Sequence, residues 1–246
     1  SITKLSHLHF PVHDEYKKRL IQLGEDPKRI YNVGGVGIDI IKEIRFLSKR
    51  ELEKKLKIKF NKKNLLVVYH PVTLQKNMAK IQIKVILQCL KDLNKTNIFF
   101  TMSNSDNEND IINKKIINFV KKNKNTYFFK SLGQLNFISL LSNVDAIVGN
   151  SSSGIIEAPA VKTITLNIGN RQLGRLMAKS VINCKPEKKE IIKNIKKIYS
   201  IKFKKDFKNP YGNGGASNKI IKVLENNKTN LSIEKKFFDL PLKILK

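Results

Sequence analysis

The sequence has no tryptophan and only two cysteines, and the shortage of cysteine excludes several kinds of site. Cys89 and Cys184 form no CxxC pair and have no histidine cluster nearby, so we expect neither a disulfide framework nor a metal. No stretch approaches the roughly 20 apolar residues of a membrane-spanning helix, and no signal-peptide pattern opens the chain. We therefore expect a cytoplasmic protein without a membrane partner.

Acidic residues and arginine are also scarce. The 20 acidic residues stand against 48 basic ones, a formal net charge of +28, and such a charge ordinarily suggests a nucleic-acid-binding protein. Only six of the 48 are arginine, however, and the lysines are spread over nearly every expected helix rather than clustered among aromatic residues. We interpret the charge as solvated helix faces and expect no nucleic-acid partner, although a positive field would help to attract a nucleotide diphosphate.

From residue 64 onward, short apolar strands alternate with helical stretches, which is typical of a parallel sheet with crossover helices. The sequence therefore predicts an α/β fold with helices on both faces of the sheet, and its 41% hydrophobic content supports a real core. The expected strands are 64–69, 97–102, 126–130, 146–148, 163–168 and 181–183, and the expected helices are 76–92, 108–122, 134–142, 153–160, 187–199 and 213–226.

The first forty residues do not follow that alternation. Residues 2–10 and 29–33 predict strands, residues 13–23 predict a helix, and the glycines of 34–37 predict a hinge rather than a phosphate loop, because GxGxxG spacing and a strong helix N-cap are missing. Two strands and one helix cannot bury a core alone. We expect three parts. Residues 1–37 are the remnant of another domain and a hinge, residues 38–226 are the α/β domain, and residues 227–246 are a lysine-rich tail.

A hydroxyl-rich turn follows the strand expected at 146–148. Gly149 breaks that strand, serines occupy 151–153, and a helix restarts near Gly154. Free backbone N–H groups at a helix start, the helix dipole and adjacent hydroxyls favour a phosphate. Glu157, about one turn later, can accept two hydroxyl protons from a ribose, so the segment indicates a nucleotide site. The simpler alternative is that the serines cap a helix and Glu157 closes its first turn.

Two other segments place polar side chains just past strand ends. Arg171 follows the strand at 163–168, and His70 follows the strand at 64–69 and precedes Pro71. Ligands of open α/β sheets collect at the carboxyl ends of strands, so we expect these side chains and the serine turn to share one crevice. A guanidinium can clamp a diphosphate in bidentate fashion. For His70, the alternative is a capping histidine.

Five separated strings carry a family resemblance. They are ITKLSHLHF at 2–10, YHPVT at 69–73, GNSSSGIIEAP at 149–159, GNRQLGR at 169–175 and NPYGNGGAS at 209–217. In order and in register, they resemble the hydrolysing UDP-N-acetylglucosamine 2-epimerases of sialic-acid and related nonulosonate biosynthesis. Five motifs in order are far more specific than a single glycine-rich loop.

The resemblance implies a two-domain, glycosyltransferase-B-like architecture of which this chain carries mostly the C-terminal, UDP-binding Rossmann-like domain. The chain then looks N-terminally truncated, because the acid and base residues of the family lie mostly upstream of the position matched by Ser1. We expect the 246-residue chain alone to be inactive. No cofactor is implied, and the intact protein is expected to be a homo-oligomer.

The resemblance also assigns residues. His70 would donate a hydrogen bond to the departing diphosphate, and Asn104, for which an ordinary loop turn is the alternative, would lie near the nucleotide. His7 and His9 would face the interdomain cleft, although two histidines on one strand face are as often structural. The residues expected to bind UDP are His70, Asn104, Ser151, Ser152, Ser153, Gly154, Glu157 and Arg171, with His70 and Arg171 stabilising the leaving group.

The implied reaction takes UDP-N-acetylglucosamine, or a related UDP-2-acetamido sugar, and inverts carbon 2. Elimination of UDP gives a glycal; water then adds at carbon 1 while carbon 2 is reprotonated on the opposite face, which yields N-acetylmannosamine or its analogue. Two alternatives stay open. One is a glycosyltransferase-B-type UDP-sugar glycosyltransferase, which the string at 169–175 disfavours, and the other is a non-catalytic UDP-binding fragment.

Overall fold

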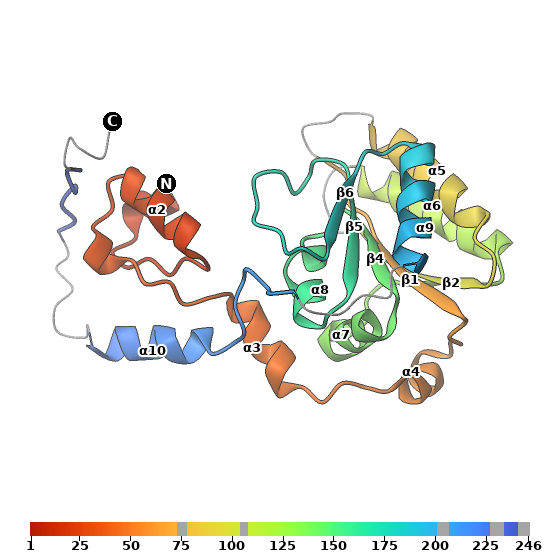
Figure 1. Ribbon diagram of the computed structural model, residues 1–246, viewed down its shortest axis with the longest axis horizontal. Helices are drawn as coiled ribbons and strands as arrows, with labels where there is room; N and C mark the ends of the chain where they lie inside the picture. Colours follow the sequence, from red (N-terminus) through yellow and green to blue (C-terminus); the bar gives the residue numbers. More distant parts are fainter. Residues whose placement is uncertain (73–77, 104–107, 201–206, 227–233, 241–246) are drawn as a thin grey trace. The chain divides into compact units, whose positions relative to one another are not determined.

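The computed structural model describes residues 1–72, 78–103, 108–200, 207–226 and 234–240 (Figure 1). They belong to two compact units, of which the first combines Ser1–Glu43 with Asn209–Lys246 and the second is Ile44–Lys208. The sequence analysis placed domain boundaries after residues 37 and 226, so the helix expected at 213–226 joins the first unit in the structure. The domain roles expected from the sequence stay a prediction.

The second unit is built on a six-stranded parallel sheet with the strand order β3-β2-β1-β4-β5-β6. All six strands expected from residue 64 onward are confirmed, with ends that shift by a residue or so. They are β1 (Lys63–Val68), β2 (Thr96–Thr101), β3 (Thr126–Phe129), β4 (Ala146–Gly149), β5 (Ile164–Ile168) and β6 (Val181–Cys184).

Helices cover both faces of this sheet, which confirms the α/β fold (Figure 1). Helices α5, α6 and α9 lie on one face, and α7 and α8 lie on the other. The central strands are buried on both faces, so they read as continuous apolar runs instead of alternating ones. The helices of this unit are α4 (Lys49–Leu56), α5 (Met78–Lys91), α6 (Asn109–Lys122), α7 (Gly133–Asn143), α8 (Glu157–Ala160) and α9 (Lys188–Ser200).

The main core lies between the sheet and helices α5, α6 and α9. Leu65 and Val67 of β1 are fully buried in it, and each helix presents apolar residues three or four positions apart to the sheet. Burying such side chains stabilises the fold by about 1.5–3 kcal/mol each. The helical members of this core include Ile83, Ile86 and Leu90 of α5, Ile112 and Ile116 of α6, and Ile191 and Ile195 of α9. No helix within the described residues is long and apolar enough to cross a membrane.

The first unit differs from its expectation. The strand expected at 2–10 is wrong, because Ile2–Leu5 form the short helix α1 and only His9 pairs, in a single bridge with Ile30. The strand expected at 29–33 is reduced to the same bridge, because no further strand among the described residues lies alongside it to complete a ladder. The helix expected at 13–23 is confirmed as α2 (Asp14–Gln22).

The glycine segment at 34–37 also departs from its expectation, because helix α3 (Val36–Glu43) begins within it. The carboxylate of Asp39 in α3 accepts hydrogen bonds from the backbone N–H groups of Ala216 (3.0 Å) and Ser217 (2.7 Å). It thereby caps helix α10 (Ala216–Asn226), which starts three residues later than the sequence predicted because the cap comes from a distant segment.

A buried carboxylate joins two distant parts of the first unit. Glu25 is 1% exposed, and it binds Lys4 Nζ at 3.1 Å, His9 Nε2 at 2.8 Å and Lys235 Nζ at 2.6 Å. Lys235 also donates to three backbone carbonyls within residues 3–6. Burial raises the pKa of the Glu25 carboxyl, but the bonds to Lys235, Lys4 and His9 outweigh it and hold the pKa below its ordinary value of 4.5.

We predict that Lys235→Ala loosens the segment around Phe238, whose N–H donates to the Gly24 carbonyl at 3.3 Å. Loss of a charged hydrogen bond should lower the opening free energy by about 2 kcal/mol. Amide hydrogen exchange at Phe238 measures this opening free energy. Lys236→Ala, at the exposed neighbouring position, is the matched control.

The wild-type contact has a defined pH dependence. Because the Glu25 pKa is lowered in the folded protein, its contribution is complete above the ordinary value of 4.5 and is lost as the pH falls through the lowered pKa. Equal protection of Phe238 in both variants at neutral pH would contradict the role of Lys235.

Candidate functional site

Three segments that follow neighbouring strands meet at the carboxyl edge of the sheet. Strands β1, β4 and β5 are adjacent, and they lead to His70, to the serine turn and to Arg171. Asn150, the first residue after β4, contacts the other two segments. The structure therefore brings together these three parts of the predicted crevice.

Asn150 makes the contacts that hold this edge together. Its side-chain Oδ1 accepts from the His70 backbone N–H and its Nδ2 donates to the His70 carbonyl, both at 2.8 Å. Its own carbonyl accepts from Arg171 Nη1 at 3.3 Å and from Gln172 Nε2 at 2.8 Å. Asn150 and Gln172 are each 1% exposed, so this network is shielded from water.

Gly149 allows β4 to end against β1. A Cβ atom at this position would lie 2.0 Å from the Val68 carbonyl oxygen, and the residue has a φ of +141°. Both features exclude residues with a side chain. Gly154 meets a second constraint, since its Cβ would lie 2.6 Å from Thr165 Cγ2 of β5. These two glycines fix the serine turn between two strands.

The helix expected at 153–160 is confirmed only in its second half. Ser152–Gly154 form a single 3-10 turn, and α8 starts only at Glu157. Ser151 is buried and its hydroxyl accepts from the Ser153 N–H at 3.3 Å, so the capping alternative accounts for this one side chain. Because both helical pieces are short, a phosphate here would depend on individual N–H and hydroxyl groups and not on a helix dipole.

Glu157, the first residue of the helix that follows the serine turn, carries the main electrostatic anomaly of this segment. Its Oε2 atom is buried and has no hydrogen-bond partner among the described residues. Burial raises the pKa of this carboxyl above its ordinary value of 4.5, although a backbone hydrogen bond opposes the shift. An unpaired buried acceptor destabilises the protein, so the site offers a vacant place for a hydroxyl donor.

A cleft of about 530 Å³ opens at the carboxyl ends of β1 to β4. His70, Ser151 and Ser153 line it together with residues that the sequence analysis missed. Most of the missed residues follow β3, and their position at or just past the end of the strand expected at 126–130 was the signal that could have found them. Those after β3 are Lys130, Ser131, Leu132, Gly133, Gln134 and Phe137.

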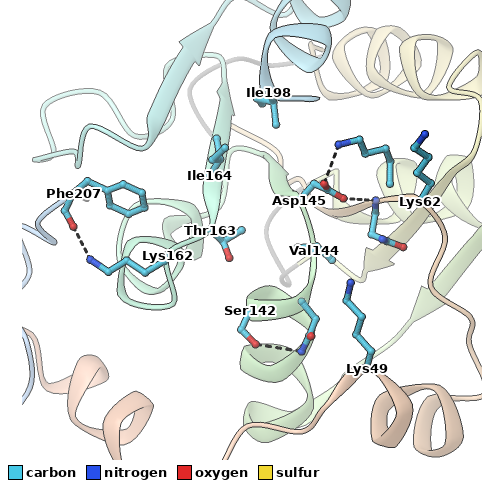
Figure 2. Close-up of a pocket in the computed structure, with 13 residues that line it drawn as sticks. Lys49, Lys62, Ser142, Val144, Asp145, Lys162, Thr163, Ile164, Ile198 and Phe207 are labelled. Atoms are coloured by element: carbon cyan, nitrogen blue, oxygen red, sulfur yellow. Dashed lines mark hydrogen bonds and ion pairs between the residues drawn. The ribbon is translucent and has the colours of Figure 1, made fainter. Parts of the chain in front are cut away.

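A smaller pocket of about 360 Å³ lies at the opposite, amino edge of the sheet, and Figure 2 shows its lysine-rich lining. Several of its polar groups have partners within the protein. Asp145 accepts from Lys63 Nζ at 3.4 Å and from the Asn64 N–H at 2.8 Å, and Lys162 donates to the Phe207 carbonyl at 2.8 Å. The unpaired Glu157 oxygen in the segment after β4 has no counterpart among the contacts described for this pocket.

The remaining predicted residues lie elsewhere. Asn104 lies outside the described residues. His9 is buried against Glu25, and His7 is partly buried in a bend, so the argument that a strand directs both to one face does not apply. Their orientation toward a cleft stays a prediction. Within the described part of the chain, no three or more His, Cys, Asp or Glu side chains gather where they could hold a metal ion.

Known proteins resemble this chain in both sequence and fold. The family model described as UDP-N-acetylglucosamine 2-epimerase matches residues 1–225. The chain is 42% identical over 245 residues to the GDP/UDP-N,N'-diacetylbacillosamine 2-epimerase (hydrolyzing) of Campylobacter jejuni, covering 98% of this chain and 63% of that protein. It is 35% identical over 246 residues to polysialic acid biosynthesis protein P7 of Escherichia coli, with coverages of 98% and 62%. The chain thus spans less than two thirds of these relatives.

Solved structures share the fold. The UDP-GlcNAc 2-epimerase of Methanocaldococcus jannaschii matches with a TM-score of 0.67 and 18% identity, over 91% of this chain and 63% of that chain. The Neisseria meningitidis UDP-GlcNAc 2-epimerase bound to UDP-GlcNAc matches with a TM-score of 0.63 and 20% identity, over 92% and 62%.

We predict that Gly149→Ala destabilises the protein by about 3 kcal/mol or more, since the new methyl group meets the Val68 carbonyl. Gly169→Ala is the matched control, because Gly169 also has a positive φ, +82°, but nothing lies within 4 Å of its Cβ position. It should cost only about 1 kcal/mol. Urea unfolding followed by circular dichroism measures both. Equal losses would mean that the close approach of β1 and β4 is unimportant.

Proposed function

Because this chain belongs to the UDP-N-acetylglucosamine 2-epimerase family, we propose that the whole protein is a hydrolysing UDP-sugar 2-epimerase and that the carboxyl edge of the sheet binds the UDP part of its substrate. The observation that carries the site assignment is the buried, unpaired Glu157 oxygen. A ribose hydroxyl would give this carboxylate the hydrogen bond that the protein does not supply.

The diphosphate would lie between the serine turn and Arg171. The Arg171 guanidinium already lies within hydrogen-bond distance of the Asn150 carbonyl, at 3.3 Å, and its other N–H groups can face a phosphate. Ser152 and Ser153 are partly exposed and can donate their hydroxyl protons. His70 lines the adjacent cleft, where its imidazole can donate a hydrogen bond to the departing phosphate oxygen.

The nucleobase would occupy the cleft that continues beyond β2 and β3. Leu132 and Phe137 supply apolar surface there, and Ser131 and Gln134 supply hydrogen-bonding groups. A flat, polar-edged ring suits such a lining. We propose uracil as the base. Since the relative from Campylobacter jejuni is named for both GDP and UDP substrates, GDP is the informative competitor.

These residues would stabilise the leaving group in the first half of the reaction. Elimination of UDP transfers the carbon 2 proton to a base, forms the double bond between carbons 1 and 2, and breaks the bond between carbon 1 and the phosphate oxygen, so negative charge develops on the diphosphate. Arg171, the serine turn and His70 would stabilise that charge. Water then adds to carbon 1 of the glycal, and carbon 2 takes a proton on its opposite face. We assign no proton-transfer role to residues of this chain. The family resemblance implies that the acid and base residues lie mostly upstream of the position matched by Ser1.

We propose a UDP-2-acetamido sugar as the substrate, and a 2,4-diacetamido sugar in particular, because two relatives are named for N,N'-diacetylbacillosamine. The cytoplasmic location and homo-oligomeric assembly expected from the sequence belong to this proposal. The glycosyltransferase alternative has no specific support in the site, although it would use the same UDP contacts.

We predict that Glu157→Gln changes stability and UDP affinity in opposite directions. Burial raises the Glu157 pKa, so the folded protein holds the proton more tightly than the unfolded chain, and ionisation above pH 4.5 destabilises the folded protein. The variant should therefore be more stable than wild type at pH 7, with no such gain near pH 4. UDP binding should weaken about tenfold, because an amide cannot accept two hydroxyl protons on one charged group.

Calorimetric titration with UDP measures the affinity, and urea unfolding at pH 7 and near pH 4 measures the stability. The exposed Glu187→Gln is the control. If Glu157→Gln binds UDP as tightly as wild type does, Glu157 does not bind the ribose. GDP binding equal to UDP binding would remove the uracil proposal and leave the diphosphate site intact.

For the reaction, we predict that the whole protein releases UDP from the UDP-2-acetamido sugar without any acceptor. In deuterium oxide, the 2-epimerised sugar product should carry deuterium at carbon 2, since that proton comes from solvent. Residues 1–246 alone should bind UDP without turnover. Acceptor-dependent release would instead identify a glycosyltransferase, and UDP binding with no release by the whole protein would identify a non-catalytic binding protein.

A further inference from the structure

All the hydrogen bonds described for Asn150 are made to the protein itself. It is 1% exposed, its side chain is bonded on both sides to the protein, and its carbonyl accepts two further hydrogen bonds. A buried asparagine can be satisfied by one neighbouring loop. Here the same residue bonds to two loops that follow different strands.

The side chain of Asn150 acts as an additional rung of the parallel ladder. The ladder between β1 and β4 ends at the pair Val68 and Gly149, and the Asn150 N–H then donates to the Val68 carbonyl at 3.2 Å. Beyond that point the Asn150 amide takes over and pairs with both the N–H and the carbonyl of His70. The His70 backbone is thereby fixed at the point where the chain leaves the sheet.

The backbone of Asn150 organises the other side of the crevice. Its carbonyl oxygen accepts from the Arg171 guanidinium and from the buried Gln172 amide. Two donors on one acceptor fix the direction from which Arg171 approaches. A displacement of Asn150 would therefore move the His70 backbone and the Arg171 side chain together.

We propose that Asn150 is a positioning residue of the leaving-group site, which touches no substrate and holds His70 and Arg171 in the places from which both act on the diphosphate. The proposal rests on the UDP site proposed above. It assigns Asn150 a role in binding geometry that goes beyond closing the sheet edge, because small displacements of groups that stabilise developing charge strongly reduce their effect.

Asn64 offers a matched control near the amino end of β1, the strand that leads to His70. It is also buried, at 2% exposure, and its side chain pairs with the N–H and the carbonyl of Asn61, both at 2.9 Å. This is the same two-way pairing of a buried asparagine with one residue of the backbone. It lies at the amino edge of β1, away from His70 and Arg171, so its loss reports the structural part of the effect.

The test uses the 246-residue chain with Asn150→Asp, Asn150→Ala and Asn64→Ala. Aspartate keeps the acceptor for the His70 N–H and replaces the donor to the His70 carbonyl by a second acceptor. Calorimetry measures UDP affinity, and urea unfolding measures stability. The imidazole resonances of the four histidines, with His70 assigned from His70→Asn, show whether UDP still shifts His70 at saturation.

We expect UDP affinity to fall about tenfold or more in both Asn150 variants, since Asn150→Ala removes both side-chain hydrogen bonds to His70 and Asn150→Asp replaces one of them by two facing acceptors. Asn64→Ala should lower stability and leave UDP affinity within about twofold of wild type. The UDP-induced shift of His70 should be lost or altered in Asn150→Asp even at saturating UDP. Adding Arg171→Ala to Asn150→Ala should then cost less than Arg171→Ala costs alone, because the guanidinium is already displaced.

Each outcome decides the matter. Wild-type affinity and an unchanged His70 shift in folded Asn150→Asp overturn the positioning role while the UDP site stands. Additive losses for Asn150→Ala and Arg171→Ala do the same. Absence of UDP binding by the folded wild-type chain overturns the UDP site and the positioning role together. If Asn150→Ala does not fold, the nearly isosteric Asn150→Asp decides alone.

Discussion

The close approach of β1 and β4 at Gly149 is the constraint on which the carboxyl edge depends. With no side chain at Gly149, the Val68 carbonyl can come near enough to accept from the Asn150 N–H. The Asn150 amide can then continue the ladder onto His70. A parallel sheet normally diverges into loops where its strands end. Here one additional rung keeps two loops together, and the third is attached through the Asn150 carbonyl.

Much of the second unit was predictable, because continuous apolar runs identify strands that are buried on both faces. The strand ends then located His70, the serine turn and Arg171. The sequence analysis missed helix α4, although the capping box of Ser48 and Glu51 marked its start. It extended a helix through the serine turn, where the close contact of Gly154 with Thr165 of β5 decides the local geometry. The bonding of Asn150 depends on contacts across 80 residues, and no local pattern predicts it.

The same edge concentrates features that local rules disfavour. Glu157 has a buried, unpaired carboxylate oxygen, and Gly149 has a backbone conformation closed to other residues. Folded proteins keep such features mainly where a ligand or a reaction needs them. The lysine-rich pocket at the amino edge has no comparable anomaly, since Asp145 and Lys162 already have partners in the protein. The proposed UDP site therefore rests on an unsatisfied acceptor and not on the high positive charge of the chain.

The first unit is discontinuous in sequence, because residues 1–43 are completed by residues from 209 onward. Ribosomal synthesis runs from the N-terminus, so the sheet of the second unit can form while the first segment still lacks its complement. During that interval Glu25 has Lys4 and His9 nearby in sequence but not Lys235. Within this chain, residues 1–43 are thus made before the segment that completes their unit, and they can reach their final packing only after residues from 209 onward have been made.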